Sequence, residues 1–155
     1  MMIDENNLSI SHVSDAGSER AGRETVSFPV LVEPAGMYEA RSVALHRRRL
    51  FGRSVTILEL ELIGAGAGEH DGTRLPWFAT SLPSKGRIAA SSKMWRAICL
   101  TLNRRPTRHD HVTERILLHH LYRVRVVTVT KDHAGHALPK AAHYSIVGAL
   151  EERLA

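Results

Sequence analysis

Apolar and polar residues alternate along most of the chain with the period of two that is typical of β-strands. The alternation is clearest in SVTILELELI, residues 54–63, where leucines at every second position face away from Glu59 and Glu61. We expect such a strand to bury its leucine face and to keep its glutamate face in water. The pattern therefore indicates a sheet with one side packed against a core.

The alternation predicts five strands, whose boundaries come from proline, glycine and polar clusters. The strands cover residues 37–50, 54–63, 74–82, 122–132 and 142 onward, and a β-rich run at 25–32, interrupted by Pro29, is an extended lead-in or an edge. Phe51, Gly52 and Arg53 separate the first two strands. This spacing predicts a tight hairpin, because Gly52 can adopt the positive φ that such a tip requires.

A helical period replaces the alternation between the third and fourth strands. Apolar residues recur at i, i+4 and i+8 from Met94 to Leu102, which predicts a helix at 91–103. Ser91 or Ser92 is a suitable N-cap for it. We expect the apolar face of this helix to cover one end of the sheet.

Two further segments are assigned from capping and composition. VTERILLHHL, residues 112–121, is predicted to be a short helix with Asp110 as its cap. GAGAGEHDG, residues 64–72, holds four of the 11 glycines and is predicted to be a flexible loop. It lacks the Gly-Lys-Ser/Thr ending of a phosphate-binding loop, so we do not expect it to hold a nucleotide phosphate.

The order of these elements predicts a mainly β fold, a five-stranded antiparallel OB-fold barrel with a helical insert between strands three and four. Closure into a barrel removes the edge strands that an antiparallel sheet would otherwise expose. An SH3-like barrel is the alternative, but an insert of about 40 residues favours the OB-fold. A parallel α/β fold would need helices between all strands. We assign residues 1–24 to a disordered acidic tail and residues 25–155 to the OB-fold domain.

The charge is distributed unevenly along the chain. Its 155 residues carry a formal net charge of +5. Residues 1–33 contain two basic and six acidic residues, a net charge of −4, so the remaining residues carry +9. A compact body this basic attracts polyanions, of which nucleic acid is the commonest in a cytoplasm. Charge therefore favours nucleic acid as the partner.

Basic side chains gather in three places. Five arginines lie within thirteen residues of the predicted hairpin with no acidic residue among them: Arg41, Arg47, Arg48, Arg49 and Arg53. Like charges this dense repel one another, which favours a ligand over a merely solvated surface. A second track follows the fourth strand, with Arg123, Arg125 and Lys131, and a third group lies before the helix, with Lys85, Arg87 and Lys93.

Aromatic side chains are the second requirement, because bases of single strands stack on them. Aromatic residues make up only 5% of the chain. We expect Phe51 at the hairpin tip and either Trp77 or Phe78 on the third strand to serve, since alternation turns one of these two outward. Trp95 is expected in the core, and the sequence leaves open the places of the three tyrosines.

Catalytic and metal chemistry are not expected. The ten histidines include His109 and His111 around Asp110, but no HExxH motif occurs and an HD-type site needs an all-helical scaffold. No nucleophile, base and acid can be assembled into a triad. The single cysteine, Cys99, excludes an intramolecular disulfide and is expected to be a buried apolar residue. We predict no cofactor.

The succession of PAGMYEAR, the basic hairpin with FGR, the leucine-rich strand, the glycine-rich loop, LPWFATSL, the helix, YRVRVVTVTKD and HYSIVGAL resembles the small OB-fold single-stranded-DNA-binding proteins of phages and mobile elements. The resemblance covers residues 34–150. It implies binding of unpaired DNA in replication, recombination or the transfer of a mobile element.

The function predicted is that of a non-catalytic single-stranded-DNA-binding protein that uses a basic groove and a few stacking aromatics. DNA is expected before RNA, replication or recombination proteins are the expected further partners, and a homo-oligomer stays open. The polar N-terminus lacks the apolar region of a secretory signal and no run of about 20 apolar residues occurs, so we expect a cytoplasmic protein. The alternative is an adaptor or subunit of a nucleoprotein complex whose arginine-rich hairpin docks on an acidic partner.

Overall fold

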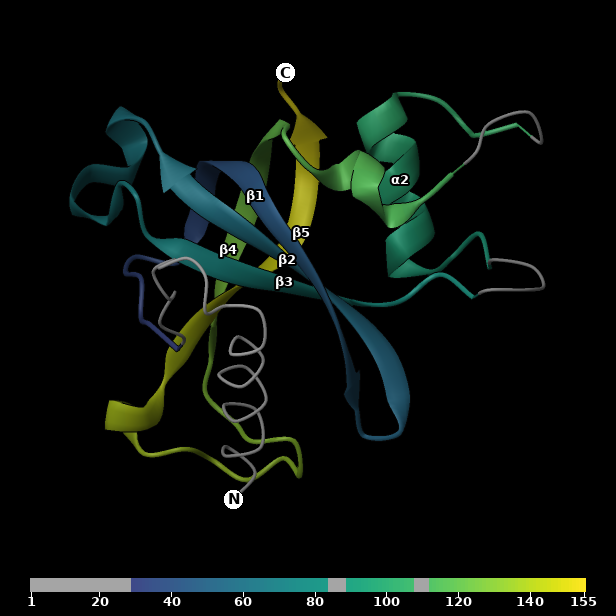
Figure 1. The fold of residues 1–155 in the computed structure, drawn as a ribbon. Coiled ribbons are helices and arrows are strands. Elements are labelled where there is room, and N and C mark those ends of the chain that lie inside the picture. Colours follow the sequence, from purple (N-terminus) through teal and green to yellow (C-terminus); the bar gives the residue numbers. More distant parts are fainter. Residues whose placement is uncertain (1–28, 84–88, 108–111) are drawn as a thin grey trace, which may run out of the picture.

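Five antiparallel strands form one sheet in the computed structural model, which describes residues 29–83, 89–107 and 112–155 (Figure 1). The strands are β1 (Gly36–Leu50), β2 (Arg53–Ile63), β3 (Arg74–Thr80), β4 (Leu121–Val129) and β5 (Tyr144–Arg153). The helices of the described residues are the α-helix α2 (Lys93–Leu102) and the short 3₁₀ helices η2 (Ala65–His70), η3 (Glu114–Leu117) and η4 (Lys140–Ala142). The mainly β prediction is confirmed, with α2 between the third and fourth strands. The predicted acidic tail, residues 1–24, lies outside the described residues.

The sheet has the strand order β3-β2-β1-β4-β5, and every pair of neighbours is antiparallel. In this order β3 and β5 are the edge strands. The sheet curls so that parts of β3 and β5 lie against each other, but within the described ranges no hydrogen-bonded ladder joins them. The sheet is therefore open, and closure into a barrel stays a prediction.

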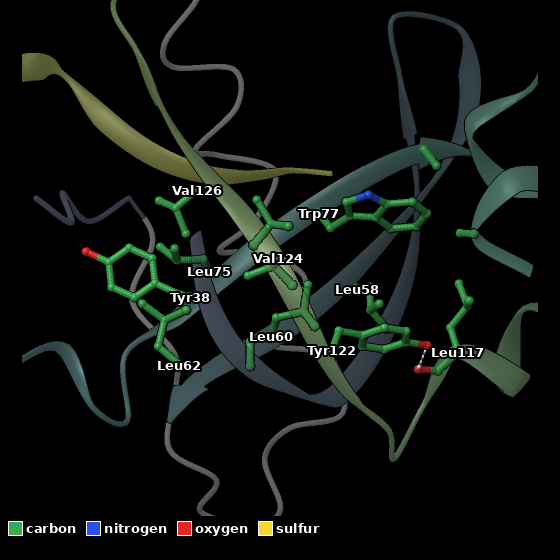
Figure 2. Packing of buried hydrophobic residues seen from close by; sticks show 14 of the residues in the cluster. Tyr38, Leu58, Leu60, Leu62, Leu75, Trp77, Leu117, Tyr122, Val124 and Val126 are labelled. Carbon is green, nitrogen blue, oxygen red and sulfur yellow. Dashed lines mark hydrogen bonds between the residues drawn. The ribbon is translucent and has the colours of Figure 1, made fainter. Parts of the chain in front are cut away.

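The core lies on the face of the sheet that carries the leucines of β2. Leu58, Leu60 and Leu62 are fully buried, as their alternation predicts. Figure 2 shows Val124 and Val126 of β4 packed in the same cluster. Met94 and Ile98 of α2 are also buried in it, so the apolar face of the helix covers the core as expected. Ser92 caps α2 by accepting a hydrogen bond from the Trp95 amide at 3.0 Å.

Tyr122 is a polar group within this core. Its hydroxyl donates to the Leu117 carbonyl at 3.1 Å, which Figure 2 marks, and lies 2.8 Å from the Thr101 hydroxyl. These bonds connect β4 to both η3 and α2. Burial raises the pKa of Tyr122 to about 12 because the phenolate would be poorly solvated there.

The opposite face of β2 is less exposed than its glutamates predict. Glu59 is only 5% exposed, so the expectation that both glutamates lie in water is wrong for this residue. Its carboxylate lies 2.5 Å from His46 Nε2 and 3.5 Å from Arg74 Nη1. A buried carboxylate requires such partners, because desolvation without them is costly.

A β-bulge between Ser42 and Ala44 divides β1 into two parts. Before the bulge β1 pairs with both β2 and β4, whereas beyond it the described ladder of β1 is with β2 alone. Because the bulge inserts one extra residue, Val43, the positions of β1 that face the core change from even-numbered to odd-numbered. Arg47 and Arg49 therefore pair with Thr56 and Ser54, which lie on the same face of β2 as the buried leucines. The far part of β1 and its partner in β2 form a hairpin, and its tip extends past the end of the β3 ladder at Val55 (Figure 1).

Two predicted segments differ from the structure, and a third is narrowed to one of its two alternatives. Residues 64–72 are not an irregular loop, because Ala65–His70 forms η2, with Ala67 buried against the core. The segment predicted to be a short helix forms only η3, Glu114–Leu117, and β4 begins at Leu121. Residues 29–32 of the run predicted to be an extended lead-in or an edge are not in a strand, which agrees with a lead-in, and residues 25–28 lie outside the described residues.

Candidate nucleic-acid interface

The hairpin between β1 and β2 ends in a two-residue turn formed by Phe51 and Gly52, and Leu50 pairs with Arg53 across it. Both turn residues have positive φ, 51° for Phe51 and 77° for Gly52. This is the pattern of a type I′ turn, whose twist matches that of the flanking strands. The predicted tip is therefore confirmed.

Phe51 is an unusual residue for the first position of this turn. Asn, Asp and Gly are favoured there, and a bulky side chain at positive φ is strained by about 1–3 kcal/mol. The side chain is also 66% exposed, the most exposed of the large hydrophobic residues in the described part of the chain. Its ring centroid lies 5.5 Å from that of His133 in the loop between β4 and β5, with 35° between the planes. The hairpin tip and this loop thus meet.

Arg47 anchors the hairpin to the rest of the domain. Its guanidinium lies 3.1 Å from Oε1 of Glu114 in η3, a residue only 5% exposed. The same carboxylate accepts hydrogen bonds from the Thr56 hydroxyl at 2.7 Å and the Leu82 amide at 2.6 Å. Three donors therefore satisfy this buried carboxylate. Arg47, predicted to bind a ligand, has a partner within the protein.

The predicted basic track along β4 is largely neutralised. Arg123 forms an ion pair with Glu152, and Arg125 forms one with Glu151 at 3.0 Å, both across the β4–β5 ladder. On β1, Arg41 lies 3.7 Å from Glu61 of β2. Lys131, at the end of the track, is exposed and has no ion pair with any described residue. The track therefore offers fewer charges to a polyanion than its sequence indicates.

The arginines around the hairpin tip differ from those of β4. Arg49 donates to the Gly52 carbonyl at 3.0 Å and Arg48 to the Arg47 carbonyl at 2.7 Å, so both are held by backbone oxygens. For Arg49 and Arg53 no carboxylate partner exists among the residues that the structure describes. Two arginines without a carboxylate partner among the described residues thus flank Phe51 in the sequence, Arg49 on one face of the hairpin and Arg53 on the other.

A hollow of about 630 Å³ lies between the hairpin, the end of β3 and the start of α2, and we call it the hairpin hollow. The residues that give it its chemistry are Phe51 and Arg53 of the hairpin, Phe78 of β3, and Ser92, Lys93 and Met94 at the start of α2. None of the described residues that line it is acidic. It brings two aromatic rings and two cations to one place, from segments far apart in the sequence.

Trp77 and Phe78 lie on opposite sides of β3, as alternation requires. Trp77 is only 1% exposed and belongs to the core, so the prediction that it stacks on a base is wrong, whereas Phe78 faces the hairpin hollow. Lys93 Nζ lies 5.2 Å from the centroid of the Trp77 indole. Burial lowers the pKa of Lys93, and the nearby charge of Arg96 lowers it further.

The third predicted basic group is described only at Lys93. Lys85 and Arg87 lie outside the described residues, as do His109, Asp110 and His111. Sequence reasoning missed six lining residues of the hairpin hollow: Leu50, Val55, Ala79, Thr80, Ser92 and Met94. Of these six residues, the sequence singled out only Ser92, as a suitable N-cap. A capping residue indicates the start of a helix and does not indicate a cavity.

Within the described ranges, no group of three or more His, Cys, Asp and Glu side chains is arranged to hold a metal ion. None of the helices described here combines the length and apolar character needed to span a bilayer. No protein-family model matches the chain, and no curated protein sequence is significantly similar to it.

Proposed function

We propose that this protein binds single-stranded nucleic acid, DNA before RNA, without catalysis, through the tip of the β1–β2 hairpin and the surface beside it. Replication, recombination or the transfer of a mobile element is the setting in which such a protein acts. The observation that carries the proposal is Phe51, an exposed aromatic side chain at positive φ, whose neighbours two positions away on either side, Arg49 and Arg53, have no carboxylate partner among the described residues.

The backbone of Phe51 supports this interpretation. A turn residue chosen for stability would be Asn, Asp or Gly, because these adopt positive φ with little strain. Exposed rings contribute about 1–3 kcal/mol each when a base stacks on them. A ligand contact of this size would offset the strain, whereas among the described residues the ring contact of Phe51 is with His133 alone.

The topology supports the same site. We propose that the curled sheet is a partly open OB-fold, in which β3 and β5 are the strands that approach at the opening. OB-folds bind oligonucleotides on the face of strands 2 and 3 and with the loops between strands 1 and 2 and strands 4 and 5. Phe51 and His133 belong to these two loops, and Arg53 and Phe78 to these two strands.

The test is the substitution Phe51→Asn, assayed by fluorescence anisotropy with a labelled 15-residue oligo-dT at two salt concentrations. We expect the melting temperature to stay constant or rise, because Asn tolerates the turn, while the affinity falls about tenfold. The matched control is Met37→Asn, which alters another exposed apolar residue on β1 away from the tip. This control should bind as the unaltered protein does.

Two outcomes contradict the proposal. The unaltered protein could fail to bind the oligonucleotide at low salt, or Phe51→Asn could bind it as tightly as the unaltered protein does. Binding to polyglutamate with no binding to oligo-dT would instead support an adaptor that docks on an acidic protein.

A further inference from the structure

We propose that the hairpin hollow is a nucleotide subsite, in which one base of the bound strand lies against Phe78 and its phosphate is held by Lys93. This inference rests on the proposed function and adds the path that the bound nucleic-acid strand follows over the protein. The strand would run from the hairpin tip across the ends of β2 and β3 toward the start of α2.

The size and lining of the hairpin hollow fit one nucleotide. Small-molecule sites commonly occupy about 300–1,000 Å³, and this hollow has about 630 Å³. Its apolar and aromatic lining suits a base, its two cations suit a phosphate, and no carboxylate among the described lining residues repels the anion.

Lys93 is a cation of the hairpin hollow without a carboxylate partner among the described residues. The residue is half-buried, and its Nζ lies 5.2 Å from the centroid of the Trp77 ring. Burial and the neighbouring Arg96 both disfavour its charge, as the lowered pKa of Lys93 records. A phosphate beside Nζ would offset both effects, because a charge-assisted hydrogen bond in a partly desolvated site is strong.

The alternative path along β4 is less favourable. A strand there would have to compete with Glu151 and Glu152 for the arginines of the track. Each such displacement would leave a carboxylate near the phosphates. The hairpin hollow involves no such exchange, and Phe51 lines both it and the tip, so that the two surfaces are continuous.

The first experiment uses Lys93→Met, which removes the ammonium but keeps an unbranched apolar side chain over Trp77. Its matched control is Lys140→Met, on η4. Binding of 15-residue oligo-dT is titrated by anisotropy over a range of salt concentrations. We expect Lys93→Met to bind about tenfold more weakly at low salt, and the slope of log affinity against log salt to become smaller by about 0.7, the value for one lost phosphate contact on a single strand. Lys140→Met should change neither quantity.

The second experiment uses the fluorescence of Trp77 in a Trp95→Phe background. Pairing of Lys93 with a phosphate alters the charge over the Trp77 ring, so oligo-dT should change the emission, and the change should be lost when Lys93→Met is added. Inorganic phosphate at the same phosphate concentration is the comparison that separates a free anion from a nucleotide. An equal change with inorganic phosphate would overturn the nucleotide subsite and leave a simple anion site.

The results distinguish the two proposals. If the unaltered protein does not bind oligo-dT, the proposed function itself is wrong. If it binds and Phe51→Asn weakens binding, but Lys93→Met keeps the original affinity and salt slope, the proposed function stands and the nucleotide subsite is refuted.

Discussion

The hairpin tip and strand β4 carry similar runs of basic residues, yet the structure gives them different partners. On β4 both arginines face carboxylates of β5, the neighbouring strand. At the tip, Arg49 and Arg53 have no carboxylate partner among the described residues, and the tip extends past the end of the β3 ladder at Val55. A basic run therefore indicates a polyanion site only where the fold leaves it unneutralised.

The largest effect is expected at the base of the hairpin, where Arg47 meets Glu114. Glu114→Gln removes the charge on which three donors converge, and the buried amide NH₂ cannot replace an acceptor. We expect the free energy of unfolding to fall by about 2–3 kcal/mol, measured by urea denaturation. Glu69→Gln, on the exposed surface of η2, is the control and should change it by less than about 0.5 kcal/mol. Equal stability of the two variants would refute an anchoring role for Arg47.

Next in size is the loss of charge at the tip. The double substitution Arg49→Gln and Arg53→Gln should weaken oligo-dT binding by about 2 kcal/mol at low salt and reduce the salt slope by about 1.4, twice the value for one phosphate. Its control is the double substitution Arg123→Gln and Arg125→Gln, which removes the same charge from β4 and should weaken binding much less. If the β4 variant loses as much affinity as the tip variant, the contrast between the two regions is wrong. Anisotropy titrations decide between them.

The smallest expected effect is on the free energy of unfolding, and it comes from Tyr122 of β4. It appears only at alkaline pH. Tyr122 has its pKa raised from 10.0 to about 12 by burial. The protonated phenol therefore stabilises the folded protein fully below about pH 10, and this stabilisation is lost as the pH rises from about 10 to 12. Between about pH 9 and pH 12 the free energy of unfolding should fall in both proteins. We expect the fall to be about 1–2 kcal/mol smaller for Tyr122→Phe than for the unaltered protein. Urea denaturation at both values checks this.

Two comparisons sharpen that measurement. Tyr144→Phe is the natural reference, because partial burial also raises the pKa of Tyr144. The substitution at Tyr122 should have the larger effect of the two. An unaltered protein whose stability does not change over this pH range would contradict the explanation by burial.

Local patterns predicted much of this fold. The period of two located the five strands, the glycine at the tip located the hairpin turn, and Ser92 was recognised as a suitable cap for α2. These features depend on residues that are neighbours in the sequence, so local physics is sufficient. For the same reason, alternation could say that either Trp77 or Phe78 faces outward but could not choose between them, because the choice depends on what covers each face.

The parts that could not be predicted all depend on distant pairings. Glu114 and Arg47 meet because η3 returns to the hairpin, and nothing in either segment indicates this contact. The hairpin hollow likewise combines residues of the hairpin, β3 and α2. The burial of Glu59 could not be predicted either, because its two partners come from the neighbouring strands rather than from β2. From the alternation of β2 alone, this glutamate was expected to be solvent-exposed.

The bulge at Val43 has a consequence that is independent of charge. As the unpaired residue of the bulge, Val43 bends β1 and so sets the angle at which the hairpin leaves the sheet. Deleting it would keep every arginine beyond it on its present side of the strand, because those residues already alternate in register with β2. The variant would then keep all its basic side chains but hold its hairpin in a different orientation to α2. Its comparison with the unaltered protein would separate the effect of the hairpin's orientation from the effect of its charge.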